Sequence, residues 1–176
     1  MKSKAVYPGS FDPFTWGHRD ITEKGLKEFG HIVVLVCETP DKYYMFNPDE
    51  RVAMVRESFH LQNLFLENFA DRVSVDKLGN KLLVDFVRSA GSRYIIRGWR
   101  DNLDLEYENR RVLANKKLDP GIETILYEAS EEYRFLSSSL IREIVKCEGG
   151  LEKIREHIHP FVYERLKSKI QDITFK

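Results

Sequence analysis

The sequence predicts an α/β fold: a doubly wound, Rossmann-like parallel sheet with C-terminal helices. Strand-like and helix-like patterns alternate along the chain, which is typical of βαβ units. Residues 32–37 are apolar throughout and mostly β-branched, as in a strand buried on both faces of a sheet. Polar or glycine-containing segments follow the predicted strands, at the edge where parallel sheets bind ligands.

The first predicted strand covers residues 5–7 and is followed by a helix from about residue 18 to 29. After the strand at residues 32–37, Asn47 gives a strong helix-start signal. Pro48 suits the first turn, and Glu50 stands where a capping box needs a carboxylate. We expect this helix to continue to about residue 59.

The second half of the chain continues the alternation. Residues 60–71 are apolar enough to form a short packed helix or an elaborated loop. Three strands and three helices are expected next: strands at residues 72–75, 93–97 and 123–127, and helices at about 82–89, 105–117 and 140–147. One or two further helices lie around Pro160. We therefore predict one domain, residues 1–176, with a helical appendage from about residue 148.

Composition excludes several protein classes. The 176 residues include 28 basic and 28 acidic side chains, so the net charge of zero gives no support to bulk nucleic-acid or membrane binding. Cys37 and Cys147 lack C-x-x-C spacing and are expected to be reduced thiols. Because the N-terminus has no signal-like apolar segment and no stretch approaches the ~20 residues of a membrane span, we expect a cytoplasmic protein.

The most informative segment is Tyr-Pro-Gly-Ser-Phe-Asp-Pro-Phe-Thr-Trp-Gly-His, residues 7–18, between the first strand and the first helix. Its two glycines let the backbone approach a ligand closely. Ser10 and Thr15 can donate hydroxyl hydrogen bonds to phosphate oxygens, and His18 falls at the start of the helix. An ordinary surface turn with incidental polar residues is the alternative.

A second segment is the run Arg97-Gly98-Trp99-Arg100, at the end of a predicted strand. Guanidinium groups match the geometry of phosphate oxygens, so two arginines beside a glycine predict an anion clamp. In the alternative, the arginines belong to a basic turn and pair with carboxylates of the next segment, Asp101, Asp104 or Glu106.

Three consecutive serines, residues 137–139, precede the helix predicted at 140–147. Hydroxyls and free amides at a helix N-terminus bind anions; N-capping would explain one serine but not three. Arg142 lies four residues after Ser138, where it could reach the same anion. Lys42, in the loop after the second strand, is by itself most simply a solvated charge.

These segments together resemble the bacterial phosphopantetheine adenylyltransferases of the T/H-x-G-H nucleotidylyltransferase superfamily. Thr15-Trp16-Gly17-His18 matches the superfamily signature. The later segments are similar to the family patterns R-G-L-R…D-F-E-Y-E and I-S-S-S/T-x-x-R/K, with departures at Trp99, Leu105 and Leu136. The similarity covers about residues 5–147, and its motifs occur in the right order.

The resemblance implies an enzyme of coenzyme A biosynthesis that joins ATP and 4′-phosphopantetheine, giving dephospho-coenzyme A and pyrophosphate. It implies Mg²⁺ bound with ATP, no metal ligands in the protein, coenzyme A as a further ligand, and a homohexamer. No nucleic acid or membrane partner is expected.

The resemblance also implies residue roles. The expected catalytic residues are Ser10 and Lys42, which orient the attacking phosphate, and His18, which hydrogen-bonds the α-phosphate in the transition state. The expected acceptor-binding residues are Ser10, Lys42, Leu83 through its main chain, and Arg97. The expected ATP-binding residues are Ser10, Phe11, His18, Gly98, Trp99, Arg100, Glu108, Tyr133, Arg134, Phe135, Leu136, Ser137, Ser138 and Ser139. A helix N-terminus disfavours imidazolium whereas phosphates favour it, so both charge states of His18 remain open.

Other functions are compatible with parts of this pattern. A sister transferase would act on nicotinate mononucleotide or glycerol phosphate, but Lys42 and the arginine segment favour the pantetheine enzymes. A nucleotide sensor without catalysis would not need Ser10, His18, Lys42 and Arg100 together. Chain length and the lack of a K-M-S-K-S-like loop exclude a class I aminoacyl-tRNA synthetase. The H-x-H residues 157–159 have no accompanying Cys or carboxylate cluster, so we interpret them as a surface bend.

Overall fold

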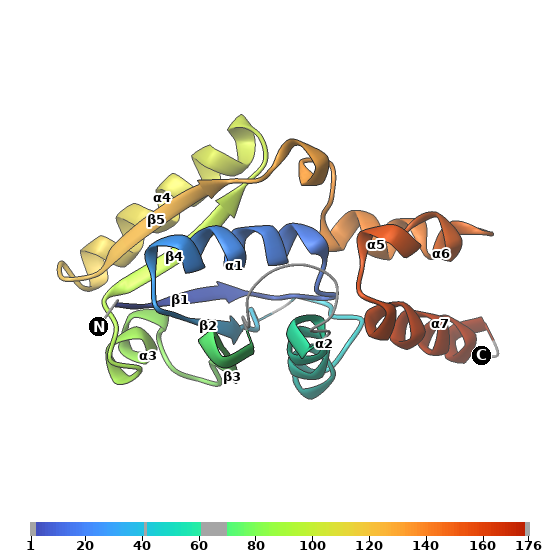
Figure 1. The fold of residues 1–176 in the computed structure, drawn as a ribbon, viewed down its shortest axis with the longest axis horizontal. Coiled ribbons are helices and arrows are strands. Elements are labelled where there is room, and N and C mark those ends of the chain that lie inside the picture. Colours follow the sequence, from blue (N-terminus) through green and yellow to red (C-terminus); the bar gives the residue numbers. More distant parts are fainter. Residues whose placement is uncertain (1–2, 41, 61–69, 175–176) are drawn as a thin grey trace.

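The computed structural model describes residues 3–40, 42–60 and 70–174, and its centre is a five-stranded parallel sheet (Figure 1). The strand order is β3-β2-β1-β4-β5, which is Rossmann-like and confirms the predicted fold class. The strands are β1 (Lys4–Gly9), β2 (His31–Val36), β3 (Val73–Lys77), β4 (Tyr94–Trp99) and β5 (Glu123–Glu128).

The helices connect the strands and complete the C-terminal part. They are α1 (Trp16–Glu28), α2 (Pro48–His60), α3 (Leu83–Ser89), α4 (Asn102–Leu118), α5 (Ser138–Ile144), α6 (Gly150–Lys153) and α7 (Pro160–Thr174). Short 3₁₀ turns are η1 (Ala70–Arg72), η2 (Glu131–Tyr133) and η3 (Arg155–His157). The segment 61–69, where the sequence allows a packed helix or a loop, lies outside the described residues.

Helix starts follow the local capping chemistry. The predicted capping box of α2 is present: Asn47 Oδ1 accepts from the Glu50 amide at 2.9 Å, and Glu50 Oε2 accepts from the Asn47 amide at 2.8 Å. α4 begins three residues before the predicted position. The reason is Asp101, whose carboxylate accepts from the Asp104 amide at 2.8 Å and so caps the helix earlier.

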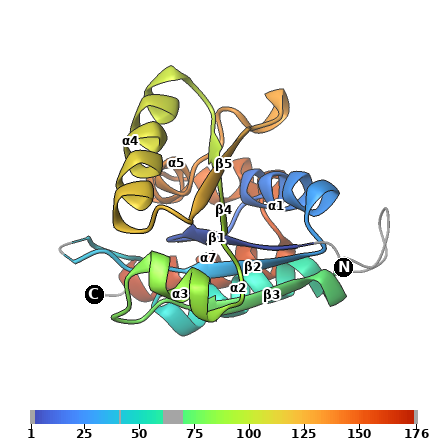
Figure 2. The same cartoon turned by 90° about the vertical axis from the view of Figure 1, so that its left-hand side faces the viewer.

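Alternate residues of the central strands point into two apolar clusters, one on each face of the sheet. Tyr7 and Val34 pack with residues of α1, α2, α5 and α7. Val6 and Leu35 point the other way and pack with α3. α4 packs along β4 and β5. The strand directions change progressively from β2 through β1 to β4 and β5, as expected for the twist of a parallel sheet (Figure 2).

The C-terminal helices lie beyond the end of the sheet toward which β1 points (Figure 1). α7 packs against α2, and Ile158, Val162 and Leu166 are buried in the same cluster as α1 and α2. The predicted appendage thus contributes to the main hydrophobic core. Among the described residues, the helices are all too short or too polar to cross a membrane.

Candidate active site

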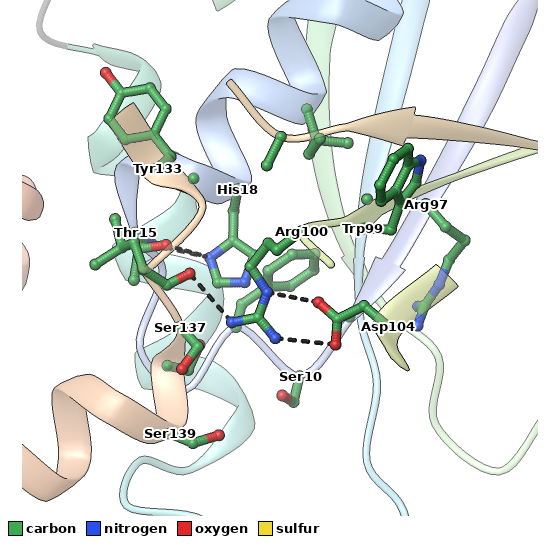
Figure 3. A pocket seen from close by; sticks show the side chains of 18 of the residues that line it. Ser10, Thr15, His18, Arg97, Trp99, Arg100, Asp104, Tyr133, Ser137 and Ser139 are labelled. Atoms are coloured by element: carbon green, nitrogen blue, oxygen red, sulfur yellow. Dashed lines mark hydrogen bonds and ion pairs between the residues drawn. The ribbon is translucent and has the colours of Figure 1, made fainter. Parts of the chain in front are cut away.

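A cavity of about 260 Å³ opens at the carboxyl ends of β1 and β4. It brings together the loop after β1, Lys42, the end of β4 with the start of α4, and the chain entering α5 (Figure 3). These are the segments that the sequence singles out, although they are far apart along the chain. Their convergence follows from the parallel topology, because all of the strands end at the same edge.

Most of the site residues named from the sequence line this cavity. They are Ser10, Phe11, His18, Lys42, Arg97, Gly98, Trp99, Arg100, Glu108, Tyr133, Leu136, Ser137, Ser138 and Ser139. Three named residues do not line it. Leu83 starts α3 and packs on the opposite face of the sheet, Arg134 pairs with Glu128, and Phe135 packs against His157.

His18 is the third residue of α1, and its ring orientation is fixed by the residue before the helix. The backbone N–H of Thr15 lies 3.0 Å from His18 Nδ1 and can only donate, so Nδ1 accepts. The Thr15 hydroxyl lies at the same distance from Nδ1 (Figure 3). The neutral ring therefore carries its proton on Nε2, which leaves a hydrogen-bond donor for the cavity.

The surroundings of His18 favour the neutral ring. The rings of Phe11 and Phe14 lie 5.1 and 5.4 Å from it between centroids. Burial, followed by the charges of Arg100 and Arg97, lowers the pKa of His18 to about 3. Of the two charge states that the sequence leaves open, these surroundings therefore favour the uncharged one at neutral pH.

Arg97 and Glu108 form a two-pronged ion pair at the cavity wall. Arg97 Nε lies 2.7 Å from Glu108 Oε2, and Nη2 lies 2.6 Å from Oε1. Nη1 also donates to the Pro8 carbonyl at 2.6 Å, and Glu108 is only 6% exposed. The pair therefore ties the end of β4 to α4 and to the loop after β1.

Arg100 fits both interpretations of its segment. It lines the cavity beside His18, and it also pairs with Asp104 through Nε–Oδ2 at 2.7 Å and Nη2–Oδ1 at 3.1 Å (Figure 3). Nη1 lies 3.4 Å from the Leu136 carbonyl oxygen, to which it donates. The guanidinium thus bridges α4 and the chain entering α5.

The three serines have different local roles. Ser137 Oγ accepts from the Leu140 amide at 3.0 Å and is the N-cap of α5, which therefore begins two residues earlier than predicted. The Ser138 hydroxyl donates to the Pro13 carbonyl at 2.8 Å and joins α5 to the loop after β1. Ser139 is exposed and lines the cavity (Figure 3).

Two buried charged residues at this edge were not identified from the sequence. Asp12 is 0% exposed and accepts from the amides of Met45 and Phe46 at 2.9 and 3.0 Å. Arg51, also 0% exposed, donates to the Ser10 carbonyl at 2.9 Å. A charged residue in a polar loop or in a helix is normally exposed, so no sequence pattern signals either of them.

The cavity carries an excess of positive charge. Lys42, Arg97, Arg100 and Arg142 line it, against the carboxylates of Asp104 and Glu108. Arg142 donates to the Asp12 carbonyl, and its Nη1 lies 3.6 Å from the Asp12 carboxylate. Such a cavity suits a polyanionic ligand.

No group of three metal-ligating side chains is found in the part of the chain that the structure describes. The predicted surface bend at residues 157–159 is wrong for His159, which is 4% exposed. It is buried because the residue before α7 packs against Trp16 at the start of α1, a tertiary contact that the local sequence does not encode.

The chain matches known families over most of its length. Residues 6–144 match the model of the cytidylyltransferase-like family. The phosphopantetheine adenylyltransferase of Heliobacterium modesticaldum is 39% identical over 169 residues, 96% of this chain and 93% of that protein. The phosphopantetheine adenylyltransferase of Thermotoga neapolitana is 41% identical over 164 residues, 93% of this chain and 96% of that protein.

Solved structures share the fold at low identity. The Plasmodium falciparum nicotinic acid mononucleotide adenylyltransferase complexed with NaAD superposes with a TM-score of 0.69 at 18% identity, covering 96% of both chains. A putative nicotinate-nucleotide adenylyltransferase from Vibrio parahaemolyticus gives a TM-score of 0.62 at 16% identity, over 94% of this chain and 99% of the other. At such identities the likeness concerns the fold alone.

Proposed function

This chain belongs to the cytidylyltransferase-like family and, within it, to the phosphopantetheine adenylyltransferases, and from this premise we propose that it transfers AMP from ATP to 4′-phosphopantetheine. The products are dephospho-coenzyme A and pyrophosphate. One observation carries the proposal: the signature His18 stands neutral, with Nε2–H available, in a cavity lined by four cationic side chains.

The reaction needs alignment more than it needs proton transfer. The nucleophile is a phosphate oxygen of 4′-phosphopantetheine, which is already ionised at neutral pH, so no general base is required. It attacks the α-phosphorus of ATP, and the bond to the bridging oxygen breaks with its electron pair leaving on pyrophosphate. Nε2–H of His18 donates to an α-phosphate oxygen as the charge is redistributed.

The acceptor phosphate lies between Ser10 and Lys42, with Arg97 beside it. Ser10 and Arg97 line the cavity from the neighbouring strands β1 and β4, and Lys42 lines it from the loop after β2. Leu83 contributes only main-chain contacts to the pantetheine arm, as the family resemblance implies. Its place on α3, away from the cavity walls, is consistent with contact to the far end of a long substrate.

The nucleotide lies on the other side of His18. Arg100 and Ser139 bind the leaving phosphates, and the backbone amide of Ser138 assists because the first amides of a helix lack intrahelical acceptors. The remaining contacts to ATP come from Phe11, Gly98, Trp99, Glu108, Tyr133, Arg134, Phe135, Leu136 and Ser137. Mg²⁺ enters as part of the ATP substrate, and coenzyme A competes for the same cavity because it contains the product.

We also propose that the chain assembles as a homohexamer. Leu103, Tyr107, Leu113 and Leu118 of α4 each expose more than half of their surface, and exposed apolar groups on one helix favour a subunit contact. Size-exclusion chromatography with light scattering should give six times the 20.7 kDa chain mass. A monomer would contradict this part of the proposal.

The function is tested by pyrophosphate release from ATP and Mg²⁺, with 4′-phosphopantetheine and nicotinate mononucleotide assayed side by side. Turnover with 4′-phosphopantetheine alone is the expected result. Turnover with the mononucleotide alone would keep the His18 chemistry and overturn the acceptor. ATP binding without turnover of either acceptor would identify a nucleotide sensor.

A further inference from the structure

We propose that Arg51 is a positioning residue for the acceptor phosphate, because it fixes the positions of Ser10 and Lys42 relative to one another. This inference rests on the proposed function, in which those two side chains hold that phosphate. Arg51 lies in the first half of α2 and does not line the cavity, so it acts through its neighbours.

The guanidinium of Arg51 joins the loop after β1 to both ends of the loop between β2 and α2. Nη1 donates to the Ser10 carbonyl at 2.9 Å and to the Cys37 carbonyl at 3.2 Å, so it spans the loops after β1 and β2. Nε donates to the Phe46 carbonyl at 3.1 Å, just before α2. Nη2 lies 2.8 Å from Glu38 Oε1. All three nitrogens have acceptors, as a fully buried guanidinium requires.

Arg51 is connected to Lys42 through the ring of Tyr44. Arg51 Cζ lies 4.4 Å from the centroid of that ring, and Lys42 Nζ lies 5.5 Å from the same centroid. Both distances suit a cation on an aromatic face. The Tyr44 hydroxyl accepts from the Thr39 amide at 2.7 Å, which closes the loop on which Lys42 stands. Tyr44 therefore holds Lys42 relative to Arg51.

The contacts of Arg51 with the Ser10 carbonyl and with the Tyr44 ring act together on the acceptor site. Arg51 holds the main chain of Ser10 directly and the ammonium of Lys42 through Tyr44, so it fixes the spacing of the two groups that orient the nucleophile. In-line attack depends on such spacing, and a misplacement of ~1 Å can cost about a hundredfold in rate. Loss of Arg51 should therefore weaken the acceptor side, which depends on both Ser10 and Lys42, far more than the nucleotide side, which shares only Ser10.

Arg72 offers a matched control at the opposite end of the sheet. It also ties loops together by donating to main-chain carbonyls, those of Leu26, Phe29 and Gly30, at 2.5, 2.8 and 3.1 Å. These acceptors lie at the end of α1 that is farthest from His18. Lysine at either position keeps the charge but cannot bond several acceptors in a fork.

The experiment compares Arg51→Lys with Arg72→Lys by steady-state kinetics well below each melting temperature. We expect Arg51→Lys to lower kcat/KM for 4′-phosphopantetheine at least about tenfold, in part through a higher KM for this substrate, with KM for ATP within twofold of wild type. Arg72→Lys should lower Tm and leave both KM values unchanged. If Arg51→Lys lowers Tm and the active fraction while neither KM changes, Arg51 is merely structural and the inference is overturned.

A second pair of variants keeps the test decisive if Arg51→Lys fails to fold. Tyr44→Leu removes the ring that both cations face, and should raise KM for 4′-phosphopantetheine but not for ATP. Tyr44→Phe keeps the ring but loses the hydroxyl that accepts from the Thr39 amide, so its KM for 4′-phosphopantetheine should rise less than that of Tyr44→Leu. Equal KM values for Tyr44→Leu and Tyr44→Phe would overturn the link to Lys42. If wild type does not turn over 4′-phosphopantetheine, the proposed function fails first, and the acceptor role of Arg51 with it.

Discussion

His18 and His159 are held by the same kind of hydrogen bond, a backbone N–H donating to the imidazole ring, at two places in the molecule. Nδ1 of each ring accepts a backbone N–H, from Thr15 at 3.0 Å and from Phe161 at 3.1 Å, so each neutral ring carries its proton on Nε2. Burial lowers the pKa of both. Only His18 lines the cavity. Nε2 of His159 is buried without a hydrogen-bond partner among the residues that the structure describes.

The difference between the two histidines is one of location, not of intrinsic chemistry. Both are uncharged donors, but one donor faces a cationic cavity and the other faces the protein interior. They are also neighbours through Trp16, whose ring is nearly perpendicular to that of His159 at 5.8 Å between centroids and which starts α1 two residues before His18. Under the proposed function, the cavity is what lets an anion meet the Nε2–H of His18 and not that of His159.

The largest expected effect comes from His18→Ala. If Nε2–H stabilises the transition state, kcat should fall by about 10²–10³, as for the loss of one oxyanion donor, while both KM values change by only a fewfold. His159→Ala is the matched control and should keep kcat within a fewfold. Steady-state pyrophosphate release measures both, and an unchanged kcat for His18→Ala would abolish the functional contrast between the two rings.

The next effect concerns stability. His159→Ala should lower the free energy of unfolding by about 2–3 kcal/mol, because it removes a buried ring that packs on Trp16. His18→Ala should cost less, since its ring adjoins an open cavity that water can enter. Urea denaturation of the two variants and wild type tests this order; a more stable His159→Ala than His18→Ala would reverse it.

Both rings should also make the protein sensitive to acid. Their folded-state pKa values are depressed, so below pH ~6.5 the unfolded chain binds protons that the folded chain does not, and stability falls as pH falls. For His18, whose pKa is lowered to about 3, the loss between pH 7 and pH 5 is roughly 2 kcal/mol. His18→Phe and His159→Phe should each flatten the pH dependence of the urea midpoint; a slope equal to that of wild type would contradict the assignment.

The smallest expected effect is that of Trp16→Phe, which tests whether the packing of His159 influences the position of His18 through Trp16. Trp16→Phe keeps an aromatic ring but reduces the contact with His159, so kcat should fall only about twofold to fivefold through a small shift of the start of α1. Combining it with His159→Ala should give a smaller loss than the product of the two single losses. Fully multiplicative losses in kcat would show that the C-terminal contact does not influence His18.

The sequence predicts what is local and repetitive. The parallel, doubly wound sheet follows from the βαβ pattern, the start of α2 from its capping box, and the position of His18 from its place between a strand and a helix. The segments at the ends of the strands therefore meet as expected. Their meeting requires only that parallel strands end at one edge.

Contacts between distant segments could not be predicted. His159 is followed by Pro160 and is typical of a bend, because its burial depends on a contact with Trp16, which lies far away along the chain. Arg51 has the pattern of an exposed helix residue, since its main-chain acceptors come from two loops whose relative positions no periodicity encodes. The pairing of Arg97 with Glu108 likewise depends on the angle between β4 and α4.

The contacts of the Asp12 carboxylate limit how the acceptor specificity could be changed by exchanging loops with a related enzyme. Asp12 belongs to the loop after β1, yet both of its carboxylate oxygens accept hydrogen bonds from the amides of Met45 and Phe46. In the other direction, the Arg51 guanidinium donates to the carbonyl of Ser10 in the loop after β1. A chimera that replaced only one of these loops would leave a buried charge without its donors or acceptors. The two loops therefore form one transplantable unit, and a graft must carry residues 10–14 together with 37–51.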